Sequence, residues 1–252
     1  MTATQFSAHV AELAKTITEY VWGETGDNGK CDCIGLIIGA LERNGVNWTG
    51  TNGTNYAARN EMRYMTPLED ASVLRVGMVV YKSKMPGQSG YDLPEKYTNG
   101  ADLNDYYHIG TVTNVEPLEI THCTSNGPIK RDNSAKGWQW YGELQKVEQT
   151  GENAGENSSA EWRTMYVQGG KLALRNGPGK NYQALLWIPA GAEVQAAPYN
   201  GEWLRVRYGK YTGYSMAEFL AETPEETADN VLVELDKATA DKLLEALKKA
   251  IK

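Results

Sequence analysis

The segment Lys30-Cys31-Asp32-Cys33-Ile34-Gly35-Leu36-Ile37-Ile38-Gly39-Ala40-Leu41 decides the fold, because a polar loop runs here into an apolar stretch with helical spacing. Apolar residues recur at the three-and-four spacing of a helix face, and Asp32 is a favourable residue at a helix start. Cys33 therefore falls in the first turn of a predicted helix. Unpaired backbone N–H groups and the helix dipole favour a thiolate there, which makes Cys33 a candidate nucleophile. The alternative is a small buried apolar role, which is common for free cysteines.

Composition excludes several classes of protein. The chain has 252 residues and a net charge of −7, so the basic surface that non-specific nucleic-acid binding needs is missing. No apolar run approaches the roughly 18 residues of a membrane span. The N-terminus has neither a basic nor an apolar leader region, so we expect no signal peptide and synthesis in the cytoplasm. Three cysteines are an odd number, and we expect free thiols instead of a disulfide framework.

The pattern of the chain predicts an α+β domain, a small all-β barrel and a C-terminal helix. We expect the first domain over 1–145, a linker rich in Glu, Gly, Asn and Ser over 146–161, and short strands with glycine turns over 162–222. Residues 223–252 hold a second linker, a short strand near 231–235 and an amphipathic helix over 238–251. The apolar stripe of that helix fits packing on the barrel and self-association equally well.

Two of the three histidines lie on a predicted β-hairpin with strands over 108–115 and 118–124. His108 and His122 share a face of this hairpin if a three-residue turn covers 114–116, and they lie on opposite faces if the turn has two residues. The sequence leaves both open. A thiol nucleophile needs a base within hydrogen-bond reach, and the first arrangement supplies His108 as that base with His122 behind it.

Five segments, in chain order, resemble motifs of the NlpC/P60 family of cell-wall cysteine peptidases. They are Tyr20-Val21-Trp22-Gly23, Asp32-Cys33-Ile34-Gly35-Leu36-Ile37, Leu74-Arg75-Val76-Gly77-Met78-Val79-Val80-Tyr81, His108-Ile109-Gly110 and Ile120-Thr121-His122-Cys123. The resemblance covers roughly residues 5–145 and implies a papain-like α+β core with no cofactor. It implies Cys33 as nucleophile, His108 as general base and His122 as the orienting residue. It further implies that Tyr20, Asp32 and Ile34 shape the oxyanion and substrate region.

The second half is similar to a bacterial SH3 (SH3b) domain. Leu172-x-Leu174-Arg175-x-Gly177-Pro178-Gly179 looks like the opening of such a domain, and Trp203-x-x-Val206-x-Tyr208 and Gly213-Tyr214 follow in order. A peptidase joined to such a barrel implies peptidoglycan stem peptides as the partner, with cleavage usually at the amide between D-γ-glutamate and the following diamino acid. Without a signal peptide, the resemblance fits a phage or prophage endolysin that acts on the wall after release.

The chain departs from the family at Cys31, Ile34 and Met78, where the family usually has an aromatic or small residue, a small hydroxyl residue and an acid. Ile34 lies where the family recognises the N-terminal side of the substrate, so the bond that is cleaved stays open.

Three other interpretations use the same residues. A zinc site would draw on cysteines and histidines of both motifs, namely Cys31, Cys33, His108, His122 and Cys123, but their spacing lacks the usual Cys-x-x-Cys knuckle. We therefore expect no metal. The second interpretation is an inactive domain in a wall-binding protein, and the third is an amidase or acyltransferase that uses the same thiol.

Overall fold

The computed structural model describes residues 1–149, 161–182, 184–224 and 241–242. The helices in these ranges are α1 (Ala3–Ala14), α2 (Gly35–Glu42) and α3 (Thr54–Asn60), with short 3₁₀ helices η1 (Ala71–Val73), η2 (Glu95–Tyr97) and η3 (Ala217–Phe219). The strands are β1 (Glu19–Tyr20), β2 (Lys30–Cys31), β3 (Met62–Pro67), β4 (Val79–Lys84), β5 (Asp105–Val115), β6 (Leu118–Cys123), β7 (Ile129–Asp132), β8 (Trp140–Leu144), β9 (Arg163–Val167), β10 (Leu172–Arg175), β11 (Ala184–Ile188), β12 (Glu193–Pro198), β13 (Trp203–Tyr208), β14 (Tyr211–Met216) and β15 (Leu220–Ala221). Most of the predicted linker, the predicted strand at 231–235 and all but two residues of the predicted C-terminal helix lie outside the described residues.

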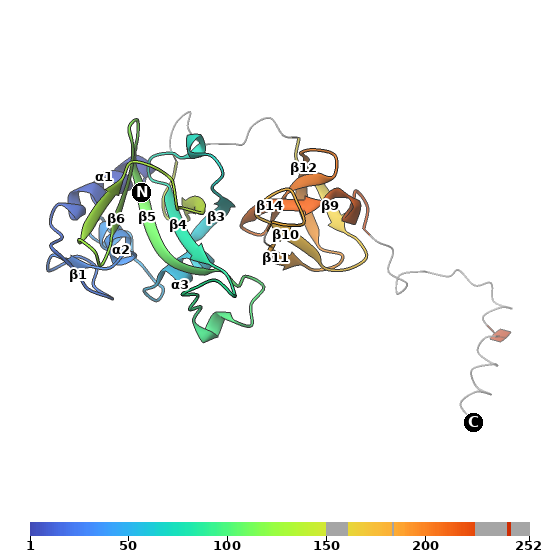
Figure 1. The fold of residues 1–252 in the computed structure, drawn as a ribbon, viewed down its shortest axis with the longest axis horizontal. Coiled ribbons are helices and arrows are strands. Elements are labelled where there is room, and N and C mark those ends of the chain that lie inside the picture. Colours follow the sequence, from blue (N-terminus) through green and yellow to red (C-terminus); the bar gives the residue numbers. More distant parts are fainter. Residues whose placement is uncertain (150–160, 183, 225–240, 243–252) are drawn as a thin grey trace, which may run out of the picture.

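The N-terminal part is built on the strand order β3-β8-β4-β5-β6-β7, with α1 and α2 on one face (Figure 1). Successive side chains of a strand point to opposite faces of a sheet. On β5, Ile109 therefore packs with the helices, whereas Val112, three residues further along the strand, packs on the other face with Trp138. The predicted α+β class is confirmed.

The apolar spacing over 4–22 predicts one amphipathic helix, but α1 ends at Ala14 and the range covers a helix and a strand. The helix ends at Ala14, where the N–H of Thr16 donates to Leu13 O at 2.9 Å and the Thr16 hydroxyl bonds the same carbonyl at 2.8 Å. Hydroxyl side chains that bond the backbone in this way compete with the helix. The chain then turns, and β1 pairs in parallel with β2, so that Tyr20 is aligned with Cys31. This break places Tyr20 beside the start of α2.

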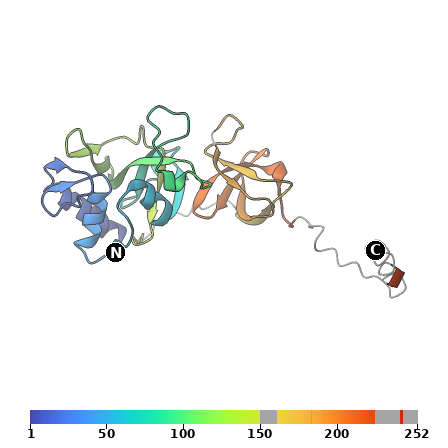
Figure 2. The same cartoon turned by 90° about the horizontal axis from the view of Figure 1, so that it is seen from below.

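The C-terminal part is all-β, and its strand pairs follow the order β11-β10-β14-β13-β12-β9-β15. Figures 1 and 2 show it at the far end of the molecule from α1 and α2, in both views. Within the described residues β11 and β15 are not paired with each other, so the barrel that the sequence predicts is not closed. The short strands lie within the range of 162–222 that the sequence predicts.

The two parts meet through β14 and β3, which pair in parallel at Tyr211 and Met65. The Met65 N–H donates to Lys210 O at 2.7 Å, and the Lys210 ammonium donates to Ala58 O at 2.6 Å. The Tyr211 hydroxyl donates to Asp102 Oδ2 at 2.6 Å. Asp102 belongs to the long connection between β4 and β5, so the C-terminal part is in direct contact with the loop that leads into the histidine strand.

Candidate active site

Cys33 lies two residues before α2, which begins at Gly35, and not within its first turn as the sequence predicts. Asp32 fixes the turn that leads into α2, because its carbonyl accepts from Leu36 N at 3.1 Å and its Oδ1 accepts from Gly35 N at 2.6 Å. Its second oxygen accepts from Gly23 N at 2.8 Å, which fixes the loop after β1 against the helix start. Cys33 is 8% exposed. The two oxygens of Asp32 therefore fix the backbone around Cys33 to the loop after β1 and to the first residue of α2.

The hairpin of β5 and β6 brings His108 and His122 to one face, but not by the route that the sequence suggested. Val115 pairs with Leu118, so the turn has two residues, which alone would place the histidines on opposite faces. The register then shifts between Val112 and Asn114, because a β-bulge adds one residue to β5. This extra residue restores the parity, and the two side chains share a face.

The two imidazoles form a chain with an acid. His108 Nε2 lies 2.8 Å from His122 Nδ1, and His122 Nε2 lies 3.2 Å from Asp132 Oδ2. The second of these is an ion-pair distance outside good hydrogen-bond geometry. Trp138 stacks on His108 with ring centroids 5.6 Å apart, and its Nε1 donates to the same Asp132 oxygen at 3.1 Å. The ring of Trp138 thus fixes both ends of the chain.

Cys33 contacts the backbone of Ile109, the residue that follows His108. The N–H groups of Ile34 and Ile109 donate to the Cys33 sulfur, and His108 directly precedes Ile109. A side-chain hydrogen bond between Cys33 and His108 is not among the contacts of the described residues. Because His108 Nε2 faces His122, its Nδ1, on the backbone side of the ring, is the nitrogen that remains for the thiol.

Burial controls the charges of this pair. It raises the pKa of the Cys33 thiol to about 12, with the Asp32 carboxylate adding to the effect, while the N–H groups of Ile34 and Ile109 act in the opposite direction. Burial also lowers the pKa of His108 to about 3, and the neighbouring His122 and Lys82 contribute. At neutral pH both groups are therefore uncharged. The thiolate that the helix start was expected to favour does not form in the resting protein, because desolvation outweighs the helix N-terminus.

The three residues expected to shape the site differ in their placement. The Tyr20 hydroxyl hydrogen-bonds the Cys33 sulfur, and burial raises the pKa of Tyr20, so it is a protonated donor at this position. Asp32 is 2% exposed, and both of its oxygens accept from backbone N–H groups. Ile34 is 2% exposed and packs in the core, so its side chain is not at the surface of the site. A role of Ile34 in substrate recognition stays a prediction.

Sequence reasoning missed Asp132, Trp138 and Lys82. Asp132 ends β7, a strand that has no clear alternation of apolar and polar residues, and Trp138 lies in the loop that follows. Lys82 pairs directly with His108 across β4 and β5. These three residues reach the histidines only because β4 and β7 pair beside the hairpin, and no sequence pattern predicted that pairing.

The residues considered as zinc ligands do not converge on one point. Cys123 Sγ donates to Cys31 O at 3.2 Å, while the two histidines contact each other. The described residues contain no group of three or more His, Cys, Asp or Glu placed to hold a metal ion. None of the helices described is long and apolar enough to cross a membrane.

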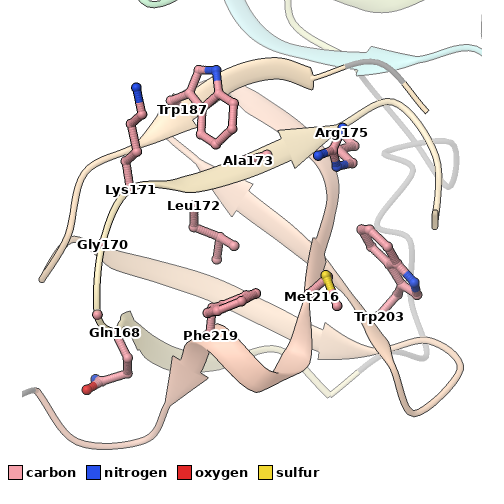
Figure 3. A pocket seen from close by; sticks show the side chains of 11 residues that line it. Gln168, Gly170, Lys171, Leu172, Ala173, Arg175, Trp187, Trp203, Met216 and Phe219 are labelled. Carbon is pink, nitrogen blue, oxygen red and sulfur yellow. The ribbon is translucent and has the colours of Figure 1, made fainter. Parts of the chain in front are cut away.

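A second candidate site is a groove of about 490 Å³ in the C-terminal part (Figure 3). Leu172 and Phe219 point into it, and Trp187 and Phe219 expose 46% and 41% of their surface. The Lys171 ammonium lies 5.0 Å from the centre of the Trp187 ring. Aromatic faces beside a cation are suited to a ligand with both apolar and anionic groups.

Neither a family model nor a curated protein matches this sequence. Among solved structures, the chain is similar to NlpC2 from Trichomonas vaginalis at 12% identity and a TM-score of 0.23, over 67% of this chain and 55% of that chain. The chain is also similar to NlpC1 from the same organism at 12% identity and a TM-score of 0.24, over 58% of this chain and 45% of that chain. For Ly7917 the identity is 13% and the TM-score 0.32, over 86% of this chain and 92% of that chain. The sequence identities and TM-scores of these three structures are low.

Proposed function

We propose that this protein is a peptidoglycan hydrolase, a thiol endopeptidase in which Cys33 attacks an amide of the stem peptide. The observation that carries the proposal is the chain from Asp132 through His122 to His108, which ends beside the residue whose N–H contacts Cys33. The order of motifs that resemble NlpC/P60 peptidases supports the same assignment. We further propose that the bond cleaved joins D-γ-glutamate to the diamino acid, and that the enzyme reaches the wall after release from the cytoplasm.

The chain of contacts determines which nitrogen can act as the base. A carboxylate only accepts hydrogen bonds, so the Nε2 of His122 that faces Asp132 carries the proton. Its Nδ1 then has a lone pair and accepts from the Nε2–H of His108. His108 therefore has its own lone pair on Nδ1, toward the Cys33 side. Asp132 and His122 act as positioning residues for the tautomer that can take a proton from the thiol.

In the proposed reaction the proton of the Cys33 thiol passes to His108 Nδ1 as sulfur bonds to the carbonyl carbon. The Tyr20 hydroxyl, which already donates to this sulfur, and the backbone N–H of Cys33 are the proposed donors to the oxyanion. His108 then gives its proton to the amine that leaves as the C–N bond breaks. Water attacks the thioester, again with His108 taking the proton, and the free acid and thiol are restored.

The test is mass spectrometry of purified muropeptides after incubation with wild type, Cys33→Ala and the control Cys123→Ala. Cys123 is a neighbouring buried thiol that the mechanism does not use, so its variant controls for general effects of removing sulfur. We expect a fragment pair that identifies the cleaved amide with wild type and Cys123→Ala, and intact muropeptides with Cys33→Ala. Full activity of Cys33→Ala or of His108→Ala would exclude the mechanism. Product masses also separate an endopeptidase from an amidase or acyltransferase.

A wall-binding protein with an inactive N-terminal part is the second candidate. The low exposure and high pKa of Cys33 favour it, since a buried neutral thiol is a poor nucleophile unless substrate binding activates it. The groove at Trp187 and Phe219 is the proposed wall-binding surface in either case. Wall binding by wild type and Cys33→Ala, without any muropeptide cleavage, would support this candidate, and Trp187→Ala would then weaken the binding.

A further inference from the structure

Lys82 lies beside the histidine pair and, among the residues described, has no acidic partner. It is directly opposite His108 in the β4–β5 ladder, and such pairs place their side chains on the same face about 5 Å apart. Its ammonium lies 4.5 Å from the centre of the Trp138 ring, and that ring stacks on His108. In the part of the chain that the structure describes, the side chain of Lys82 forms no hydrogen bond or ion pair, although the residue is partly buried.

The acids near this lysine are already engaged. Asp132 accepts from Trp138 and lies at an ion-pair distance from His122. Asp32, on the nucleophile side, accepts from two backbone N–H groups. Lys130, opposite His122 on β7, adds a second positive charge on the same face. Two lysines, Lys82 and Lys130, thus face the histidine pair, together with one carboxylate, Asp132, that is already engaged.

We propose that Lys82 binds a free carboxylate on the substrate residue whose carbonyl Cys33 attacks. This inference rests on the proposed function and names a determinant of its specificity. In a γ-linked D-glutamyl residue the scissile amide is on the side chain, so the α-carboxylate stays free and lies a few bonds from the reacting carbonyl. A partly buried ammonium beside the base is placed to pair with that charge. An α-amidated D-isoglutaminyl residue has the same shape without the charge and is the disfavoured substrate.

The experiment compares two synthetic stem peptides that differ only in an α-carboxylate or an α-carboxamide on the γ-linked residue. Cleavage is measured with wild type, Lys82→Gln, Lys82→Arg and Lys136→Gln. Lys136 is exposed on the loop that carries Trp138, so its variant removes one positive charge at a residue that takes no part in the proposed site. Binding of both peptides to Cys33→Ala, with and without Lys82→Gln, is measured by calorimetry.

We expect wild type and Lys136→Gln to prefer the carboxylate peptide by about tenfold or more in kcat/KM, since the carboxamide cannot form the charged hydrogen bond with Lys82. Lys82→Gln should lose this preference, and Lys82→Arg should retain it. Equal loss on both peptides would show that Lys82 only supports Trp138 and would overturn the proposal. Equal binding of both peptides to Cys33→Ala would overturn it as well.

The proposed function fails separately, when wild type cleaves neither peptide. In that case a carboxylate preference in binding to Cys33→Ala, removed by Lys82→Gln, still supports the role of Lys82. The absence of such a preference contradicts it.

Discussion

The resting state of Cys33 gives the sharpest prediction, because its thiol is neutral where a thiolate–imidazolium pair would be expected from the position alone. With a pKa of about 12, the thiolate fraction at pH 7 is about 10⁻⁵, compared with about 10⁻² for an ordinary cysteine. Since only the thiolate is alkylated, we expect iodoacetamide to modify Cys33 at least about 100-fold more slowly than free cysteine at pH 7. The logarithm of the rate should rise by about one per pH unit up to pH 9.

The assay follows carboxamidomethylation of the peptide that contains Cys33 by mass spectrometry between pH 5 and 9, in wild type and His108→Ala. A neutral pair predicts that His108→Ala does not slow alkylation, because there is no imidazolium to stabilise a thiolate. A rate plateau between pH 5 and 7 that is lost in His108→Ala would show an ion pair and refute the reasoning. The dependence of the rate on pH separates the pKa effect from limited access to the buried thiol, because low exposure lowers the rate equally at every pH.

Three further predictions concern the histidine chain. Asp132→Ala should lower kcat by about tenfold or more, corresponding to about 1.4 kcal/mol, because the tautomer of the base is no longer fixed; kinetics on muropeptides measure it. Gly110→Ala places a methyl group 2.8 Å from Trp138 Cη2 and should destabilise the fold by about 1–3 kcal/mol in urea, whereas Gly170→Ala, with nothing within 4 Å, should change it by less than about 0.5 kcal/mol. The unfolded chain binds more protons than the native one between about pH 6.5 and the lowered pKa of His108, about 3, so stability should fall across this range on acidification, and His108→Gln should flatten the fall.

Local patterns were sufficient for the elements that carry the candidate nucleophile and base. Asp32 before an apolar run predicts the helix α2, and alternation predicts β5 and β6; all three are present. The range 4–22 shows the limit of the same method. Its apolar spacing continues past Ala14, but the Thr16 hydroxyl bonds the backbone and the chain leaves the helix to pair as β1. Periodicity alone cannot show where a competing hydrogen bond ends an element.

The relative orientation of the histidines depended on a feature that no sequence pattern specified. A two-residue turn alone separates His108 from His122, and the bulge between Val112 and Asn114 brings them back to one face. Side chains of a strand alternate with a period of two, so one added residue inverts the outcome. Lys82 was missed for a related reason, since it reaches His108 through the pairing of β4 with β5, whereas Asp132 was missed because β7 has no clear alternation. Contacts of this kind depend on the register of the whole sheet.

The same burial that makes Cys33 and His108 neutral determines what a substrate must provide. Transfer of the thiol proton creates an imidazolium on His108, and this positive charge forms beside Lys82, which disfavours it. A substrate carboxylate paired with Lys82 would neutralise that ammonium and lower the cost of the imidazolium. The carboxylate should therefore raise kcat as well as lower KM, because part of its interaction is gained only as the new charge develops. If the two substrates differed in KM alone, Lys82 would contribute to binding without any influence on the proton transfer.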